Sequence, residues 1–238
     1  MLITLIWMLG FCLGMLFTIP FLCIYYIAKL LAGNEKADKL AFFFTRFWAK
    51  SIILSTCSKV NIIGKENLTT SRNVCFIANH QSYFDIPVMM GWLGRPIGFI
   101  AKKELKKVPI LSGWITAIHS AFLDRSNPRK AIESINKGAE NIKAGHAIVI
   151  FPEGTRSKDG QVHDFKTGSL KLAFGSGAVI QPVTINGSRV IFEQNKRIRK
   201  SEISLIIHSA IHPNDDIYKE KTMLIEKLQS VIASGIKL

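Results

Sequence analysis

A histidine and an aspartate, separated by four residues, directly follow an apolar run of the chain. His80 and Asp85 stand in the segment NHQSYFD, which comes after the run Val74–Ala78. A histidine oriented by a carboxylate can take a proton from a hydroxyl group near neutral pH. If the pair is catalytic, the chain is an enzyme that turns an alcohol into a nucleophile.

His80 and Asp85 can meet only if the chain turns between them. On a continuous helix an offset of five residues rotates by about 140°, so the two side chains would diverge. Pro87 favours a helix that begins here, because proline suits the first turn of a helix. Exposed N–H groups at that end would keep Asp85 ionised, so that it holds one imidazole nitrogen protonated and leaves the other as the base. Taken alone, the spacing also fits a histidine that merely caps a helix.

A second polar segment, FPEGTRS at residues 151–157, follows the apolar run 147–150. Its proline and glycine break the strand and expose backbone at the C-terminal end, where open α/β sheets bind their ligands. Arg156 offers planar donors suited to phosphate, and Glu153 can accept a hydrogen bond from a substrate hydroxyl. The alternative interpretation is a polar turn with a surface Glu–Arg pair.

Two shorter segments end further apolar runs. Residues 122–125 read FLDR, and residues 179–185 form an apolar strand interrupted by Pro182. By itself the second is more simply a strand with a proline at an edge or bulge.

These four segments, in this order, resemble the glycerolipid acyltransferase family, typified by bacterial 1-acyl-sn-glycerol-3-phosphate (lysophosphatidate) acyltransferases. The family's pattern is NHxxxxD, then GxxFxDR, then FPEGTRS, then a strand ending in PV. The first and third blocks are complete in this chain, the fourth matches at residues 182–183, and the likeness runs from residue 60 to residue 187. The second block matches except that His119 stands where the family usually has glycine. Without this glycine, the close backbone approach that a glycine allows is in question, whereas the role of Arg125 is not.

The resemblance implies a direct transfer reaction. His80 is then the general base and Asp85 its orienter, and the hydroxyl of a lysophospholipid attacks an acyl thioester without an acyl-enzyme. The chain accordingly has no G-x-S-x-G nucleophile elbow. Because a thioester is already activated, one positioned base suffices, and such a base contributes about 10²–10⁴-fold. Backbone N–H groups near His80 or Gly154 are expected to stabilise the oxyanion.

The resemblance also implies a set of residues that bind the acceptor, with the arginines on its phosphate. These residues are Arg125, Glu153, Gly154, Thr155 and Arg156, and Lys102 is a weaker candidate because a lysine at the start of a helix is more often solvated. No metal site is expected, since His208 and His212 have no set of ligands nearby. No cofactor is expected beyond acyl-CoA or acyl carrier protein as co-substrate.

The charge balance of the chain favours an acidic partner. Its 238 residues contain 31 Lys and Arg against 17 Asp and Glu, a net charge of +14. Anionic lipid, a phosphorylated substrate or an acidic carrier protein would fit this excess. Nucleic acid is disfavoured, because no zinc-finger or RNA-binding signature accompanies the charge. The four cysteines lie in apolar runs without a CxxC pair, which predicts free, buried thiols in a reducing compartment.

The first 28 residues carry no charged side chain, and the first charge is Lys29. This exceeds the length of about 20 residues that a bilayer crossing needs. The cations follow the apolar run, unlike those of a signal peptide, and predict a catalytic domain on the cytoplasmic face of a membrane, the inner membrane if the source is bacterial. Gly10, Gly14 and Pro20 interrupt the run, so crossing and monotopic insertion both stay open. Residues 41–50 mix aromatics with cations and suit a helix at the headgroup level.

The elements that must position the site predict an α/β fold. A mostly buried central sheet flanked by helices (residues 57–238) is preceded by a membrane-associated helical segment (residues 1–56). Asn127 and Gly145 bound a predicted helix at 128–144, and a final helix at 219–233 is expected to pack on the sheet. The predicted strands are 60–63, 74–78, 97–101, 121–123, 147–151, 179–185 and 203–208.

Other functions also fit these residues. One alternative is an acyltransferase whose acceptor is a different lysolipid, such as a lyso-aminolipid, or glycerol 3-phosphate. A thioesterase would use His80 to activate water, and a non-catalytic lipid-binding or membrane-scaffold protein would need no His–Asp pair. Thioester consumption measured with and without lysophosphatidate separates the transferase from the last two.

Overall fold

A seven-stranded sheet forms the centre of the computed structural model, which describes residues 2–124 and 126–236. The strand order is β1-β7-β6-β2-β5-β3-β4, and β6, β2, β5, β3 and β4 run parallel, whereas β7 and β1 run the other way. Each predicted strand is present with its ends within one residue of the prediction. The strands are β1 (Lys59–Ile63), β2 (Val74–Ala78), β3 (Gly98–Lys102), β4 (Ala121–Leu123), β5 (Ile148–Ile150), β6 (Val179–Asn186) and β7 (Glu202–Ile207).

The central strands are apolar throughout because helices cover both faces of the sheet. In β2, Val74 and Phe76 belong to the core on one face, and Cys75 and Ile77 belong to the core on the other. All residues of β2 and β5 are buried. This confirms the mostly buried sheet expected from continuous apolar runs, whose successive side chains point to opposite faces.

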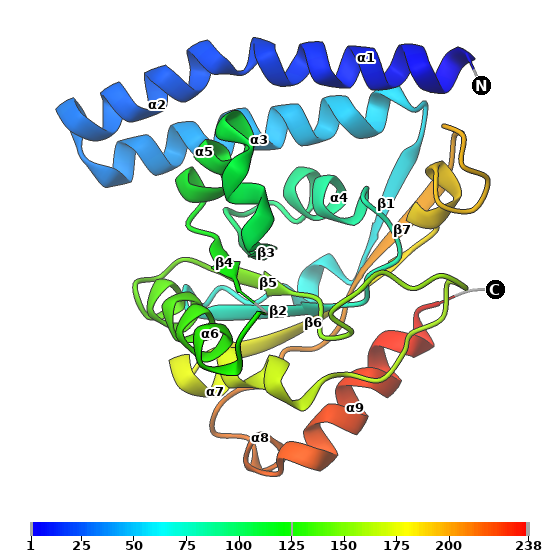
Figure 1. Ribbon diagram of the computed structural model, residues 1–238. Coiled ribbons are helices and arrows are strands. Elements are labelled where there is room, and N and C mark those ends of the chain that lie inside the picture. The colour runs from blue at the N-terminus through cyan, green and yellow to red at the C-terminus, as the bar shows by residue number, and fades with distance from the viewer. Residues whose placement is uncertain (1, 125, 237–238) are drawn as a thin grey trace.

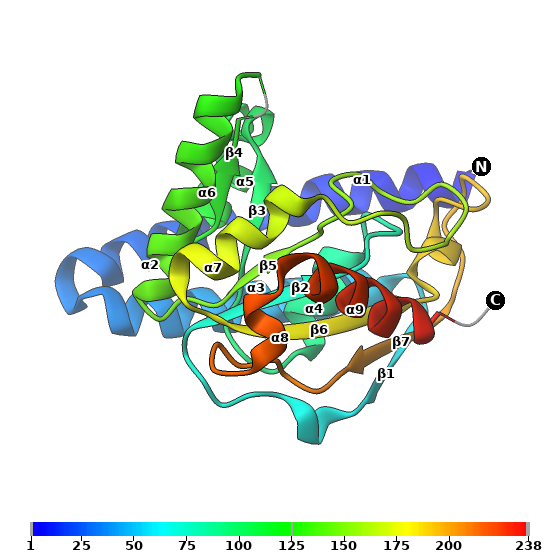
Figure 2. The same cartoon turned by 90° about the horizontal axis from the view of Figure 1, so that it is seen from below.

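Two groups of helices form the outer layers (Figure 1). Helices α3 (Asn34–Ser55) and α4 (Asp85–Trp92) cover one face, and α6 (Pro128–Lys143), α7 (Lys171–Ser176) and α9 (Lys221–Ser234) cover the other, which Figure 2 presents from below. Apart from the apolar N-terminus, the described residues also form α5 (Pro109–Ala117), α8 (Asp216–Lys219) and short 3₁₀ helices at Lys65–Asn67, Lys103–Lys107, Thr167–Leu170 and Ser188–Ile191.

The two helices predicted at residues 128–144 and 219–233 are present as α6 and α9. Asn127 caps α6 by accepting a hydrogen bond from the N–H of Arg129 at 2.8 Å, and Gly145 follows the helix with a left-handed φ of +91°. The final helix α9 packs on the sheet through Leu224 and Leu228, both fully buried.

The apolar N-terminus forms α1 (Leu2–Phe17) and α2 (Ile19–Ala32), which together are long and apolar enough to cross a membrane. They lie along the domain instead of projecting from it (Figure 1). The ring of Trp7 lies 5.5 Å from that of Phe84, and Nε1 of Trp114 donates to Oγ1 of Thr18 at 3.0 Å. Tyr25 is only 1% exposed. The segment therefore contacts the domain along its length while its other side stays exposed.

The helical segment shares its core with the sheet. Ala49 and Ile53 of α3 belong to the same buried cluster as Val74 and Phe76 of β2. Helix α3 ends at Ser55 and β1 begins at Lys59, so the proposed division between residues 56 and 57 falls in the turn between them. That the two parts are separate domains stays a prediction.

All four cysteines are free, but the expectation that they are buried is wrong for three of them. Cys75 is buried in β2, whereas Cys12, Cys23 and Cys57 are exposed. The physical reason for two of them is that α1 and α2 turn only one side toward the domain.

Candidate active site

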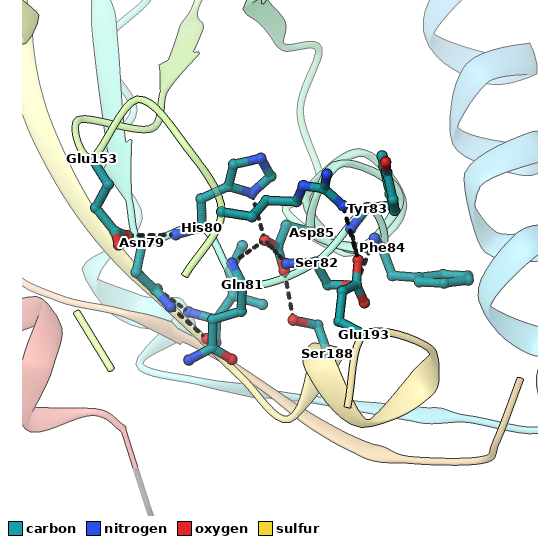
Figure 3. A network of polar contacts seen from close by, with 12 residues as sticks. Asn79, His80, Gln81, Ser82, Tyr83, Phe84, Asp85, Glu153, Ser188 and Glu193 are labelled. Atoms are coloured by element: carbon teal, nitrogen blue, oxygen red, sulfur yellow. Dashed lines mark hydrogen bonds and ion pairs between the residues drawn. The ribbon is translucent and has the colours of Figure 1, made fainter. Parts of the chain in front are cut away.

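The chain turns sharply between His80 and Asp85, as their spacing requires. Strand β2 ends at Ala78 and helix α4 begins at Asp85. Nδ1 of His80 lies 2.7 Å from Oδ2 of Asp85 (Figure 3). The side chain of His80 is 17% exposed and that of Asp85 is 0% exposed. The carboxylate is therefore sealed inside the protein, while the imidazole remains within reach of a ligand.

Several donors converge on the buried carboxylate of Asp85. Oδ2 accepts hydrogen bonds from the backbone N–H groups of Gln81 at 2.7 Å and Ser82 at 2.8 Å, and Oδ1 accepts one from the hydroxyl of Ser188 at 2.5 Å. Such bonds offset the cost of burying a charged group. An ionised carboxylate can only accept hydrogen bonds, so the Nδ1 atom of His80 that faces it carries the proton. Nε2 is then unprotonated and can accept a proton from a ligand.

The imidazole of His80 is held from the side by an aromatic ring. Its centroid lies 4.1 Å from that of Phe151, with the planes 15° apart, and Phe99 stacks behind Phe151 at 6.4 Å. The backbone of His80 is also tied to the FPEGTRS segment, because its carbonyl accepts a hydrogen bond from the N–H of Ser157 at 2.7 Å. The first and third sequence blocks thus form one structural unit.

Glu153 completes this connection. It is 4% exposed, and its Oε1 accepts from the N–H of His80 at 2.8 Å while its Oε2 accepts from the N–H of His163 at 3.3 Å. Burial raises the pKa of the Glu153 carboxyl. Both oxygens face the protein's own backbone, so in this geometry Glu153 positions the His80 loop. Its contact with a substrate hydroxyl stays a prediction.

Arg156 is held against the His80–Asp85 turn by Tyr83 and Glu193. Its guanidinium carbon stacks 3.5 Å from the centroid of the Tyr83 ring, and its Nη1 lies 3.4 Å from Oε1 of Glu193. Glu193 also accepts hydrogen bonds from the hydroxyl of Ser82 at 2.6 Å and from the N–H of Tyr83 at 2.7 Å. With its side chain 33% exposed, Arg156 is preorganised and still open to an anionic ligand.

The backbone at Gly154 requires a glycine. Its φ is +74°, and a Cβ there would lie 2.9 Å from Nζ of Lys166. The N–H of Gly154 donates to the carbonyl of Phe151 at 3.0 Å, and that of His80 donates to Glu153. Within the region expected to supply oxyanion donors, the N–H groups of these two residues therefore already have partners. Thr155 beside them is exposed.

The other predicted binding residues end neighbouring strands at the same edge of the sheet. Lys102 is exposed at the end of β3. Beside it, Nζ of Lys103 pairs with Oδ1 of Asp124 at 2.9 Å and so connects the ends of β3 and β4. Arg125 lies outside the described residues. His80, residues 151–156 and Lys102 are thus brought to one edge of the sheet, the carboxyl edge of the parallel strands, as expected.

The long-range contacts of three residues in the candidate site could not be predicted from the sequence. Ser188 and Glu193 follow β6 and reach the His80 loop across more than a hundred residues, with no spacing to indicate the pairing. Asn79 extends the β2–β6 pairing with its side chain, which donates to the carbonyl of Ile185 and accepts from its N–H, both at 2.8 Å. The one available signal was polarity directly after an apolar strand.

His119 adopts the conformation that a glycine would favour, with φ at +56°. The backbone at residues 118–119 nevertheless lies close to the start of β3. A Cβ on Gly98 would lie 2.6 Å from the carbonyl oxygen of Ile118 and 3.1 Å from the carbonyl carbon of His119. The glycine that permits the contact is therefore on the facing strand.

Known proteins resemble this chain in both sequence and fold. A family model described as Acyltransferase matches residues 59–186. The 1-acyl-sn-glycerol-3-phosphate acyltransferase of Borreliella burgdorferi is 30% identical over 198 residues, which cover 83% of this chain and 78% of that protein. The chloroplastic 1-acyl-sn-glycerol-3-phosphate acyltransferase LPAT1 of Arabidopsis thaliana is 32% identical over 204 residues, and this chain spans only 55% of its length.

A solved structure extends the likeness to nearly the whole chain. The crystal structure of the 1-acyl-sn-glycerophosphate (LPA) acyltransferase PlsC from Thermotoga maritima has a TM-score of 0.79 and 29% sequence identity. The match covers 95% of this chain and 93% of that one. With the sequence blocks, the geometry around His80 and the fold in agreement, the chain belongs to the acyltransferase family.

Proposed function

We propose that this chain transfers a fatty acyl group from an acyl thioester, acyl-CoA or acyl carrier protein, to the sn-2 hydroxyl of 1-acyl-sn-glycerol 3-phosphate. The product is phosphatidic acid, an intermediate of phospholipid biosynthesis. The observation that carries the proposal is the 2.7 Å contact between Nδ1 of His80 and the sealed carboxylate of Asp85. The names of the Borreliella and Thermotoga proteins support this choice of acceptor.

In the proposed reaction Nε2 of His80 removes the proton of the acceptor hydroxyl as its oxygen attacks the thioester carbonyl. The tetrahedral intermediate collapses, the carbon–sulfur bond breaks, and the imidazolium returns its proton to the departing thiolate. Asp85 stabilises the transient imidazolium and fixes the tautomer that leaves Nε2 as the base. The stacking on Phe151 restrains the ring so that Nε2 keeps one direction.

The phosphate of the acceptor is assigned to Arg156, together with Lys102 and Arg125. Arg156 is the best supported, because stacking on Tyr83 and the contact with Glu193 hold its planar donors beside the His80–Asp85 turn. The arginine fork matches phosphate geometry and would orient the acceptor relative to His80.

We also propose that the protein lies in one leaflet of the membrane instead of crossing it. The 31-residue apolar stretch Leu2–Ala32 is held against the domain at Trp7, Thr18 and Tyr25, contacts that a crossing helix would lose. Its outward side continues onto α3, where Phe43 and Phe47 are 65% and 67% exposed. The net charge of +14 favours the anionic cytoplasmic face.

Thioester consumption by the purified protein tests the function. Acyl-CoA and acyl carrier protein are each supplied in mixed micelles with lysophosphatidate, a lyso-aminolipid, glycerol 3-phosphate or no acceptor. Consumption that requires lysophosphatidate and yields phosphatidate supports the proposal. Consumption without an acceptor would identify a thioesterase, and no consumption at all would favour a lipid-binding protein.

The variant His80→Ala tests the general base. Its turnover should fall by about 10²–10⁴-fold, the usual contribution of such a group, without a change in melting temperature. His212→Ala is the control, because His212 is exposed near the C-terminal helices and far along the chain from the His80 loop. Near-wild-type turnover of the purified His80→Ala protein would contradict the assignment.

A further inference from the structure

A second cluster of chemically capable side chains lies at the opposite edge of the sheet. It borders a cavity of about 930 Å³ whose lining includes Gly98 at the start of β3 and Ala147 just before β5. These are the amino ends of parallel strands, whereas His80 follows the carboxyl end of β2. The cavity is thus separate from the candidate active site, and the acyl-transfer proposal does not use it.

Three side chains in this cavity carry ligand atoms close to one another. They are Asp38 of α3, His119 after α5 and His146 before β5, all half-buried. Nε2 of His119 lies 2.8 Å from Oδ1 of Asp38, and the rings of His119 and His146 stack with centroids 3.5 Å apart. One nitrogen or oxygen atom from each of the three lies within 4.8 Å of the other two.

The backbone around the histidines is firmly held. The side-chain N–H of Asn141 on α6 donates to the backbone carbonyl of His119 at 2.7 Å. The backbone carbonyl of Asn141 accepts a hydrogen bond from the backbone N–H of His146 at 3.0 Å. One residue thereby holds the backbone of both histidines. His119 keeps its left-handed φ of +56°, a conformation that is unfavourable when a side chain is present. Glycine would avoid this cost, so the imidazole of His119 requires an explanation.

We propose that Asp38, His119 and His146 bind a divalent transition-metal cation of the Zn²⁺ class. Two imidazoles and one carboxylate are ligands that such cations take in proteins, with a further position left for water. The planes of the two stacked rings are 11° apart, so binding requires the rings to rotate until one nitrogen of each lies at about 2.0–2.1 Å from the metal. The adjoining cavity provides room for this rotation.

The bound cation would connect two layers of the protein. Asp38 belongs to α3 in the membrane-associated layer, whereas His119 and His146 belong to loops of the α/β part. A cation shared among them would hold α3 to the amino edge of the sheet and raise the stability of the folded state.

The charges around the cavity define a second, independent expectation. Lys39 is neutralised by Glu35 at 2.7 Å, and Arg95 donates to the carbonyl of Thr69. Arg72 also lines the cavity, next to Gly145, and its charge opposes a cation. Replacing it by a neutral side chain should therefore strengthen metal binding, an effect that a purely structural His–Asp contact would not produce.

Metal titration of the untagged, chelator-treated full chain in detergent tests the proposal. Isothermal titration with Zn²⁺ should give one equivalent, and Co²⁺ should develop visible d–d absorption. His146→Ala and Asp38→Asn should each weaken binding by at least tenfold, and Arg72→Gln should tighten it several-fold. His163→Ala is the matched control, because His163 also pairs with a carboxylate, Asp159 at 2.9 Å, but outside the cavity.

His119→Gly keeps the test valid if other variants fail to fold, because glycine suits the left-handed backbone at this position. Without metal, this variant should melt at the same temperature as the wild type. Added Zn²⁺ should raise the melting temperature of the wild type but not that of the variant. The proposal is overturned if Zn²⁺ releases no more heat with the wild type than with His119→Gly, or if Co²⁺ absorption is absent. Neither readout depends on acyl transfer.

Discussion

Ser188 donates its hydroxyl hydrogen bond to Oδ1 of Asp85 at 2.5 Å, although the two residues are 103 positions apart. The other carboxylate oxygen of Asp85 is occupied by His80 and by backbone N–H groups. Both oxygens are therefore restrained, so the carboxylate cannot rotate away from His80. In the proposed mechanism Ser188 is therefore a positioning residue, and no sequence block contains it.

Ser188→Ala should lower kcat about tenfold and leave the KM for lysophosphatidate unchanged. The variant removes one donor to a buried charged group, which is worth about 1.5–3 kcal/mol, while the remaining donors still hold the other oxygen. Steady-state kinetics at saturating donor measure both constants. Ser176→Ala is the control, because it removes another buried serine hydroxyl, one that donates to carbonyls of its own helix α7. Equal losses of kcat in both variants would contradict the positioning role.

Arg156→Lys should raise the KM for lysophosphatidate about tenfold and leave the KM for the acyl donor unchanged. Lysine keeps the charge but loses both the planar fork and the stacking on Tyr83. Glu193 should stay in place, because the hydroxyl of Ser82 and the N–H of Tyr83 still donate to it. An acceptor KM equal to that of the wild type would remove Arg156 from the phosphate site.

Glu153→Gln should change how stability depends on pH. Burial raises the pKa of the Glu153 carboxyl above its ordinary value of 4.5, so in a window that begins near pH 4.5 and extends upward the folded state binds more protons than the unfolded chain. Stability therefore falls as pH rises through this window. The neutral amide lacks this effect. The melting temperature of the variant minus that of the wild type should increase with pH across the window, and a flat or falling difference would contradict the prediction.

Replacing both Phe43 and Phe47 with serine should weaken binding to anionic vesicles by about tenfold per residue, measured by co-sedimentation. Full burial of such a side chain is worth about 1.5–3 kcal/mol, and these two are exposed in the protein, so its melting temperature should not change. Met223→Ser on α9, at the far side of the molecule, is the control, with Met223 58% exposed (Figure 1). The same loss of binding in this control would contradict the assigned membrane face.

Much of the fold follows from local patterns. Continuous apolar runs predicted all seven strands within one residue, and Asn127 and Gly145 marked the ends of α6 correctly. The contact between His80 and Asp85 was also within reach of the sequence, because both residues belong to one turn and Pro87 signals the helix that follows. Such signals depend on residues that are close together along the chain, and the sequence shows these residues directly.

The rest was decided by which loops the sheet brings together. The order β6-β2-β5 places Ser188 beside Asp85 and turns Glu153 toward the backbone of His80, and neither contact has a local signal. The approach of Asp38 to His119 joins positions 81 residues apart in the same way. The sequence by itself determined the strands and the His80–Asp85 pair, because periodicity and turn chemistry are local. Only the tertiary structure decided what supports that pair, because strand order and register set the long-range contacts.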